Sequence, residues 1–315
     1  MRILNDRYEL EQRIGVGGMS EVWRARDRVL DRPVAVKLIA PAQADRPESL
    51  ERIRTEARAA ARLVHPNVAS VHDFGLAPAL PGQQLPYLVM ELVEGETLAV
   101  HLAARPLDWR ISVRVCAEVC AALAAAHAHN IVHRDIKPAN IMLTPAGAKV
   151  LDFGIAAPTG ELDPGVDGAV LGTPVFVAPE RFDGVPATPA TDMYAVGVLL
   201  HLCLANRLPW PVDTGVRTGR AGRHRRPDPL PPIDGLPPEV LELARQCLAR
   251  NPADRPTSMA AALVLAESVG VQVYAPLGEL PLPRPRPAAV SPWTEQAATA
   301  ATDVAGAEVD ARESA

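Results

Sequence analysis

Lysine is scarce in this chain. Of the 32 basic residues, only Lys37, Lys137 and Lys149 are lysines, and the others are arginines. Lysine carries a compact point charge on a flexible stem, whereas arginine presents a planar fork of donors. The few lysines in the chain are therefore candidates for contacts that the planar group of an arginine does not make. Lys149 is the exception, because its extended surroundings favour an ordinary exposed strand residue.

Cysteine is also rare. The four cysteines show no pairs at zinc-ligand spacing, and we expect no secretory leader, which together fit a reducing cytosol. Cys116 and Cys120 lie four residues apart in an alanine-rich helical segment, so we interpret them as small buried hydrophobic residues. The cysteine pattern therefore argues against a zinc site or a disulfide framework, and a metal or redox role is the less favoured alternative.

Long apolar runs and strong net charge are absent as well. No segment reaches about 18 consecutive apolar residues, so we expect no membrane span and a cytoplasmic protein. A net charge of −5 and a pI near 5.9 argue against a general binder of nucleic acids or membrane surfaces. The basic run from Arg217 to Arg226 is interpreted as a solvated loop, with recruitment of an acidic partner as the alternative.

The chain nevertheless has enough apolar residues for a sizeable core. Hydrophobic residues make up 48% of 315, which suits one large domain or two lobes. From Pro276 onward the sequence is rich in proline, then in alanine and acidic residues. Such a composition buries too little surface to offset the entropy of ordering. We expect a domain at residues 8–271 and a disordered tail at residues 272–315.

One stretch places charged side chains in a fixed order. Residues 133–140 read His-Arg-Asp-Ile-Lys-Pro-Ala-Asn, and Asp-Phe-Gly follows at residues 152–154. Asp135 can accept a proton from a hydroxyl group, and Lys137 can neutralise a nearby phosphoryl group. Asn140 and Asp152 offer oxygen ligands, and Mg²⁺ usually takes only one or two carboxylates from a protein. A hairpin with its turn at residues 144–148 would bring both ligands to one end.

This spacing resembles the catalytic loop and the magnesium loop of eukaryotic-type protein kinases, which read H-R-D-x-K-x-x-N and D-F-G. The resemblance implies ATP and Mg²⁺ as cofactors, with Mn²⁺ as an alternative metal, held by Asn140 and Asp152. It implies that Asp135 receives the hydroxyl proton and that Lys137 steadies the phosphoryl group. Lysine at position 137 implies serine and threonine acceptors. The composition, rich in Ala, Arg and Pro, is similar to that of actinobacterial members.

A glycine cluster near the start predicts a strand, a tight turn and a second strand. It resembles the kinase glycine-rich loop, with Ser20 at the third glycine position, which is small enough to keep the backbone near the phosphates. The nucleotide-binding residues that the resemblance implies are Ile14, Gly15, Val16, Gly17, Gly18, Val22, Ala35, Lys37, Met90, Glu91, Val93 and Met142.

Lys37 follows in a predicted strand, and the family pairs this lysine with a glutamate on a helix. The segment 47–64 is predicted to be that helix, and Glu56 is the expected partner, with Glu51 as the alternative. An ion pair at about 4 Å would be worth on the order of 4 kcal/mol at an effective dielectric of 20, before desolvation. The pair is therefore a candidate switch.

The second half continues the resemblance. Helices are predicted at residues 98–104 and 111–129, and His127 and His129 are interpreted as caps of the latter. The segment 152–180 is similar to a kinase activation segment, in which Thr173 would orient Asp135. Between Gly154 and Gly172 the only hydroxyl is that of Thr159. We expect Glu161, Asp163 or Asp167 to replace a loop phosphate beside Arg134.

Two further residues are implied to be structural. Asp192 matches the buried aspartate that braces the backbone of the catalytic loop in kinases. Arg255 matches the arginine that pairs with the glutamate of the A-P-E sequence, here Glu180.

The predicted fold is α+β, with a small β-rich lobe at residues 8–93 that carries one main helix, and a larger helical lobe at residues 96–271. The implied function is ATP-dependent phosphorylation of serine and threonine hydroxyls on proteins, including autophosphorylation. Phosphopeptide-binding proteins are a further class of partner that this function implies. The alternatives are a pseudokinase scaffold and a small-molecule kinase; the complete motif set argues against the first, and the A-P-E ending against the second.

Overall fold

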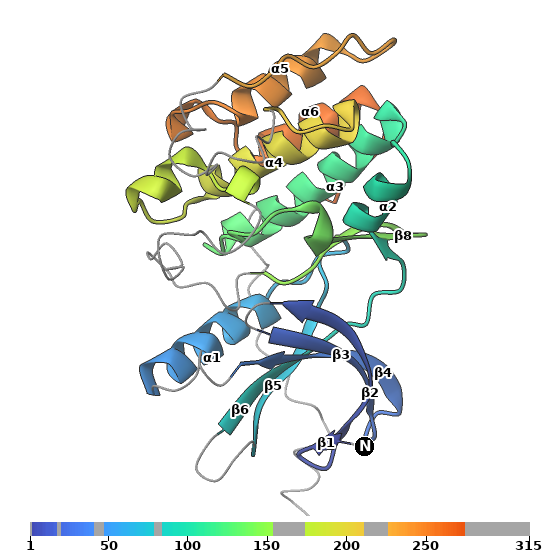
Figure 1. Ribbon diagram of the computed structural model, residues 1–315, viewed down its shortest axis with the longest axis vertical. Coiled ribbons are helices and arrows are strands. Elements are labelled where there is room, and N and C mark those ends of the chain that lie inside the picture. Colours follow the sequence, from blue (N-terminus) through green and yellow to red (C-terminus); the bar gives the residue numbers. More distant parts are fainter. Residues whose placement is uncertain are drawn as a thin grey trace, which may run out of the picture. The chain divides into compact units, whose positions relative to one another are not determined.

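Six antiparallel strands form the N-terminal sheet (Figure 1). The structure, a computed structural model, describes residues 2–17, 20–40, 47–78, 84–153, 174–210 and 226–274, all within the unit Met1–Pro276. Six consecutive residues of the central strand β4 are buried, because both faces of the sheet are covered there. The strands, in their spatial order, are β1 (Arg2–Leu4), β2 (Tyr8–Gly17), β3 (Ser20–Asp27), β4 (Arg32–Ile39), β6 (Gln84–Met90) and β5 (Val71–Pro78).

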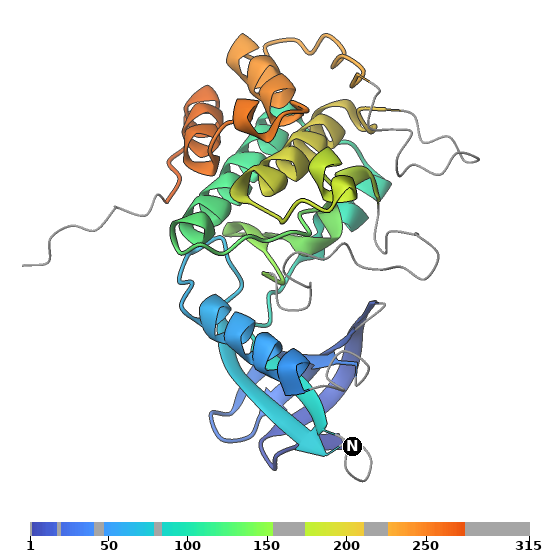
Figure 2. The ribbon, with the colours of Figure 1, turned by 90° about the vertical axis from the view of Figure 1, so that its left-hand side faces the viewer.

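One helix, α1 (Pro47–Ala61), packs beside β5 in this part of the chain (Figure 2). Ile53, Ala57 and Ala60 are its buried residues, at the spacing of one helix face. The helix ends three residues earlier than the predicted end at residue 64. Its last turn closes with a bond from the amide of Leu63 to the carbonyl of Ala60, before the His65-Pro66 sequence excludes helical backbone.

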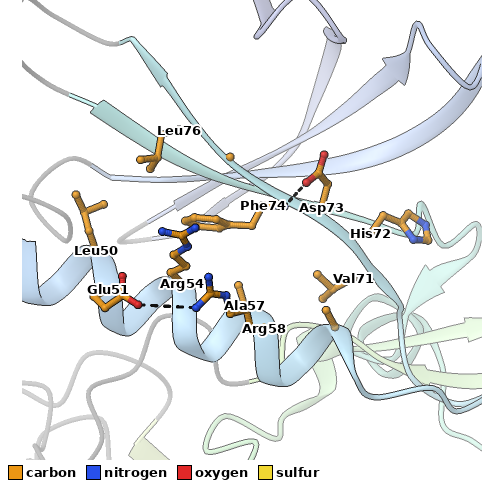
Figure 3. Close-up of a pocket in the computed structure, with 12 residues that line it drawn as sticks. Leu50, Glu51, Arg54, Ala57, Arg58, Val71, His72, Asp73, Phe74 and Leu76 are labelled. Carbon is orange, nitrogen blue, oxygen red and sulfur yellow. Dashed lines mark hydrogen bonds and ion pairs between the residues drawn. The ribbon is translucent and has the colours of Figure 1, made fainter.

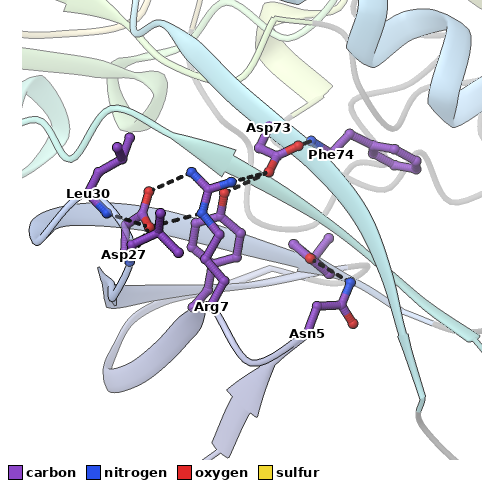
Figure 4. A network of polar contacts seen from close by, with 9 residues as sticks. Asn5, Arg7, Asp27, Leu30, Asp73 and Phe74 are labelled. Atoms are coloured by element: carbon purple, nitrogen blue, oxygen red, sulfur yellow. Dashed lines mark hydrogen bonds and ion pairs between the residues drawn. The ribbon is translucent and has the colours of Figure 1, made fainter.

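A polar network fastens the start of the chain to the sheet (Figure 4). The Arg7 guanidinium donates to both oxygens of Asp27, at 2.9 and 2.8 Å, and lies 3.4 Å from Asp73. Asp27 is buried, and the hydrogen bonds from Arg7 lower the pKa of its carboxyl to about 2. The Tyr8 hydroxyl donates to Asp73 at 2.7 Å. The network thus joins β2, β3 and β5.

The helical part is built around α3 (Trp109–Ala128), of which 14 residues are buried, which makes it the centre of this core. Figure 2 shows the other helices around it, and α4 and α6 contact it directly. α3 is the only described helix long and apolar enough to cross a membrane, but 72% of that window is buried inside the protein. The other helices are α2 (Leu98–Ala104), α4 (Pro189–Ala205), α5 (Pro238–Cys247) and α6 (Ser258–Ser268), with short 3₁₀ turns at Pro138–Asn140, Pro174–Phe176, Pro179–Asp183 and Pro252–Asp254.

A small sheet of β7 (Glu96–Thr97), β8 (Ile141–Thr144) and β9 (Gly147–Val150) lies beside these helices. The hairpin was predicted with a turn at residues 144–148, and the turn is in fact shorter. Gly147 has a positive φ of 124°, and a Cβ atom there would lie 2.9 Å from the carboxylate of Glu118. That carboxylate accepts the amide hydrogen of Ala148, so glycine allows pairing to begin at residue 147.

The predicted architecture of a β-rich part with one main helix followed by a helical part is confirmed. Strand β1 was not predicted. All four cysteines are buried, as expected for Cys116 and Cys120. The domain limits at residues 8 and 271 stay predictions. The tail from residue 275 and the part of the basic run at residues 217–225 lie outside the described residues.

The predicted pair between Arg255 and Glu180 is present and buried. The guanidinium makes two parallel bonds to the carboxylate, at 2.7 and 2.8 Å, and the Arg255 side chain is 0% exposed. It also donates to the carbonyl oxygens of Ala249 and Ala190. The pair therefore ties the segment before α4 to the segment before α6.

We predict that Arg255→Met lowers the free energy of unfolding by about 3 kcal/mol, because it leaves the Glu180 carboxylate buried without its cation. Urea denaturation followed by circular dichroism measures the change. The matched control is Arg245→Met, which removes an exposed pair with Glu242 on α5 and is expected to leave stability almost unchanged. Equal effects of the two substitutions would contradict the assignment.

A second prediction concerns His201 on α4, which is 2% exposed and whose Nε2 atom has no hydrogen-bond partner. Burial lowers the pKa of its imidazole from 6.5 to about 4. The unfolded chain therefore binds a proton between these values while the folded chain does not. The contribution of His201 to the free energy of unfolding is fully present above pH 6.5, and it falls by about 3 kcal/mol as the pH drops to 4.

Denaturation between about pH 4 and 7 tests this contribution by comparison with His201→Leu. The variant should lose about 3 kcal/mol less than the wild type over that range. His65 and His72, whose pKa values are also lowered by burial, are present in both proteins, so their contributions cancel. The same pH slope in both proteins would show that His201 is not the group responsible.

Candidate active site

The catalytic-loop sequence at residues 133–140 is held by the buried carboxylate of Asp192. This side chain is 1% exposed and accepts the backbone amide hydrogens of His133 and Arg134, each at 2.8 Å. Arg134 has a φ of 71°, in the left-handed region that non-glycine residues seldom adopt. The two bonds support this turn of the backbone. The brace that was expected of Asp192 is therefore present.

Two histidines complete the support. His133 Nδ1 accepts the amide hydrogen of Asp135 at 3.2 Å, so its Nε2 carries the hydrogen that bonds the carbonyl of Leu151 at 2.9 Å. The His133 ring thus links the catalytic loop to the residue before Asp152. His127 was interpreted as a helix cap, but its ring lies between Asp192, at 2.8 Å, and Ser258, at 3.0 Å. It joins the brace to α6, whereas His129 ends α3.

Three of the predicted catalytic and metal residues meet at one point. Lys137 Nζ lies 2.7 Å from Asp135 Oδ2, and Asn140 Nδ2 donates to the same oxygen at 2.9 Å. Asn140 also donates to the carbonyl of Asp135 at 2.7 Å. The Asp135 side chain is 56% exposed, so the carboxylate is oriented by both neighbours and still open to an incoming hydroxyl group.

Lys37 on β4 reaches Asp152, which lies just after β9. The Lys37 Nζ atom is 3.1 Å from Asp152 Oδ1, and their side chains are 10% and 27% exposed. Asp152 Oδ1 is buried and makes that ion pair but no hydrogen bond. Asp152 also has a φ of 57°. A charged oxygen with spare acceptor capacity is therefore held beside a cation, in backbone geometry that costs energy.

Glu56 does not make the predicted pair with Lys37. Its Oε1 atom instead accepts from the Arg134 guanidinium at 3.3 Å, and both side chains are 17% exposed. Burial raises the pKa of the Glu56 carboxyl, and the nearby Arg134 opposes this shift. The physical reason for the difference is that each cation already has another carboxylate beside it. Lys37 lies beside Asp152, and Arg134 lies beside Glu56. Sequence spacing cannot distinguish between the two combinations.

Glu51, the alternative partner of Lys37, lies elsewhere. It lines a groove of about 690 Å³ between α1 and β5, together with Leu50, Arg54 and Phe74 (Figure 3). Its carboxylate is 3.9 Å from the Arg58 guanidinium in the same groove. The alternative is therefore wrong for this arrangement of the chain.

The interpretation of Lys149 as an ordinary exposed residue is also wrong. Its Nζ atom lies 2.8 Å from each carboxylate oxygen of Glu91, and the two side chains are 20% and 31% exposed. Glu91 is the first residue after β6, where the chain passes toward the helical part. The Glu91 carboxylate lies near β9 because β9 and the loop before β5 form backbone hydrogen bonds. No local sequence pattern predicts these bonds.

Several of the predicted nucleotide-binding residues lie on neighbouring strands of the six-stranded sheet. Val22, Ala35 and Met90 share one apolar cluster, and Ala35 pairs with Met90 across β4 and β6. Ile14 and Val16 are exposed apolar side chains on β2, and Gly15 pairs with Val22. Val93 and Met142 are half-buried. Gly18 and Thr173 lie outside the described residues, as do Thr159 and the loop carboxylates Glu161, Asp163 and Asp167.

Gly95, in the segment between the two parts, is closely packed. A Cβ atom at this position would come within 2.1 Å of the carbonyl oxygen of Leu143, and its φ is 151°. Glycine is therefore required for the approach of this segment to β8.

The oxygen ligands suit a hard divalent cation. Asp152 offers a buried oxygen with spare acceptor capacity, and Asn140 offers an amide oxygen, because its nitrogen is turned toward Asp135. Among the described residues no group of three or more His, Cys, Asp or Glu side chains forms a metal cage. A cation bound here would take most of its ligands from phosphates and water, as Mg²⁺ commonly does.

The comparisons with known proteins agree with this geometry. The family described as "Protein kinase domain" matches residues 8–266. The serine/threonine-protein kinase PknA of Mycobacterium tuberculosis is 40% identical over 254 residues, which are 80% of this chain and 58% of that protein. PknB of Mycolicibacterium smegmatis is 40% identical over 260 residues, 80% of this chain and 41% of that protein. The chain thus spans about half the length of these relatives.

A solved structure adds to the comparison. The crystal structure of the kinase domain of M. tuberculosis PknI aligns with a TM-score of 0.63 and 26% identity, and covers 85% of this chain and 97% of that one. The expected fold with a β-sheet lobe and a helical lobe is thereby confirmed.

The pairing of Glu56 can be tested directly. We predict that Arg134→Met raises the pKa of the Glu56 carboxyl further, because burial is then no longer opposed by the guanidinium. A carbon-13 NMR titration of labelled glutamate carboxyls measures the pKa. Arg52→Met removes a weaker positive influence on the same group and should give a smaller shift. A larger effect from Arg52 than from Arg134 would contradict the pairing.

Proposed function

Since the chain belongs to the protein kinase domain family, we propose that it transfers the terminal phosphoryl group of ATP to serine and threonine hydroxyls of proteins, including its own. The observation that supports this most directly is the grouping of Asp135, Lys137 and Asn140, in which Lys137 and Asn140 lie 2.7 and 2.9 Å from one oxygen of Asp135. We assign the kinase domain to residues 8–271, with lobes at about 8–93 and 96–271.

In the proposed reaction Asp135 accepts the proton of the attacking hydroxyl group. Its Oδ2 atom is already oriented by Asn140 and Lys137, so little reorganisation is needed as the hydroxyl approaches. The Lys137 ammonium lies beside that carboxylate, where it would oppose the negative charge that accumulates on the phosphoryl oxygens. Positioning and charge stabilisation are the main contributions that a protein makes to phosphoryl transfer.

We propose that Asp152 and Asn140 hold Mg²⁺, with Mn²⁺ as an alternative, and that the ion neutralises the phosphate charge when bound. Lys37 would anchor the phosphates from the sheet side, where it now lies beside Asp152. Gly15, Gly17 and Gly18 would cover the phosphates, and Thr173 would orient Asp135. The backbone of Glu91 and Val93 would bind the base, next to the apolar side chains Ile14, Val16, Val22, Ala35, Met90 and Met142.

Glu56 is proposed to exchange partners during activity. In the described arrangement the Glu56 carboxylate is held by Arg134, so Lys37 lacks the helix-borne partner that positions it in the family. Movement of Glu56 to Lys37 would release Arg134 for a carboxylate or phosphate on the segment before residue 174. The ion pairs are few and partly exposed, so the two arrangements are expected to differ little in free energy.

For the cellular setting we propose a cytoplasmic enzyme that acts on protein substrates and whose products phosphopeptide-binding proteins recognise. The burial of 72% of the window of α3, the one described span-length helix, supports a role for this helix in the core. The rival function is a nucleotide-binding scaffold without transfer activity.

Autophosphorylation with γ-labelled ATP and Mg²⁺ separates the two functions. We predict incorporation by the wild type and a loss on the order of a hundredfold or more in Asp135→Asn, since general base catalysis contributes at least that much. The Asn side chain keeps the size of Asp, so ADP binding by the variant should be unchanged.

The control is Glu242→Gln, which changes an exposed carboxylate on α5 and should leave incorporation at the wild-type level. ADP binding without incorporation by the wild type would favour the scaffold and contradict the proposal.

A further inference from the structure

The pair between Lys149 and Glu91 is placed where the two lobes join. The Lys149 ammonium lies 2.8 Å from both oxygens of the Glu91 carboxylate. The two side chains are 20% and 31% exposed, so they lie in the range where an ion pair is less screened than on the open surface. In a chain with three lysines, each lysine contacts a carboxylate of this region, at Asp152, Asp135 and Glu91 respectively.

Glu91 is fixed by its backbone as well as by its side chain. Its amide donates to the carbonyl of Ser70 at 2.8 Å, and its carboxylate accepts the Ser70 amide hydrogen at 3.3 Å. Ser70 belongs to the loop between α1 and β5. The first residue of the linker is therefore held by two hydrogen bonds with Ser70 and by the Lys149 ammonium on β9 in the helical lobe.

The same loop is joined to β9 along its length. Val150 donates its amide hydrogen to the carbonyl of Asn67 at 2.8 Å, and Ala69 donates to the carbonyl of Val150 at 3.0 Å. The Asn67 side chain donates to the carbonyl of Ala148 at 2.8 Å. Linker, loop and strand β9 thus form one junction, in which the Lys149 ammonium is the contact from β9 to the linker.

This junction lies between the two ends of the proposed nucleotide site. β9 leads directly to Asp152, three residues after Lys149, and Glu91 begins the segment proposed to bind the base. We propose that Lys149 is a positioning residue, whose ion pair with Glu91 holds the base-binding linker in register with the metal-binding Asp152 and so sets the affinity for adenine nucleotides. The inference rests on the proposed function of this site.

The physical argument is one of preorganisation. Without the ammonium, the linker keeps its hydrogen bonds to Ser70 but loses its side-chain contact with β9, and nucleotide binding must then restore the register between linker and strand. Such a loss affects the bound ground state and the transition state equally, so it raises KM and leaves kcat nearly unchanged. The reacting groups Asp135 and Lys137 lie on a different loop and keep their contacts with each other.

The test is the binding of Mg²⁺–ADP by isothermal titration calorimetry together with KM and kcat for ATP. Lys149→Met keeps the length of the side chain and removes its charge. We expect ADP affinity to fall and KM to rise by about fivefold, which corresponds to the loss of one partly exposed ion pair. Lys149→Arg should restore values close to those of the wild type, because guanidinium also pairs with carboxylate.

A double-mutant cycle identifies the partner. If Lys149 acts through Glu91, then Lys149→Met combined with Glu91→Gln should weaken ADP binding no more than either single substitution. Arg245→Met is the control for loss of a positive charge and should leave affinity and KM unchanged, since it lies on α5 in an exposed pair.

Unchanged ADP affinity in Lys149→Met, or a fall in kcat and thermal stability without a change in KM, would overturn the inference. Additive effects of the two substitutions would do the same. A failure of the proposed function would look different, because the wild type would then bind ADP without incorporating phosphate.

Discussion

The buried carboxylate of Asp192 is the contact on which the site depends. A charge at 1% exposure is unfavourable unless it is fully bonded, and here it accepts from two backbone amides and from the His127 ring. Those bonds hold Arg134 in the left-handed backbone conformation and so determine the position of the backbone that carries Asp135 and Lys137. Because α4 carries Asp192 and packs on α3, the core of the helical lobe positions the catalytic loop.

The junction between the lobes connects the helical lobe to the sheet. The loop between α1 and β5 bonds to β9, and β9 precedes Asp152, so the proposed metal ligand is tied to both lobes. Lys37 on β4 lies beside Asp152, which adds a second contact between the two lobes. By contrast, α1 is attached to the catalytic loop through the pair of Glu56 with Arg134, which is weaker than a covalent or backbone link. The most adjustable part of the site is therefore the helix that carries Glu56.

Much of this arrangement follows from the sequence, for identifiable reasons. The motif around Asp135 predicted residues that do converge, and the family resemblance implied the pair of Arg255 with Glu180. Both predictions succeeded because each set of contacts forms within one lobe. The pairing of Lys149 with Glu91 could not be predicted, since it arises where a loop, a linker and a strand meet. The bridging role of His127 depends in the same way on α6. The partner of Glu56 was predicted wrongly, because the sequence is compatible with two arrangements of the same charges.

The central claim is that residues from both lobes bind one nucleotide and one divalent cation. A crystal structure of the protein with Mg²⁺ and a non-hydrolysable ATP analogue tests it most directly. The account predicts the metal on Asp152 and Asn140, the phosphates beside Lys37, the base against the backbone of Glu91 and Val93, and the Asp135 carboxylate facing the terminal phosphate. A nucleotide bound elsewhere, or a metal held without Asp152, would contradict it.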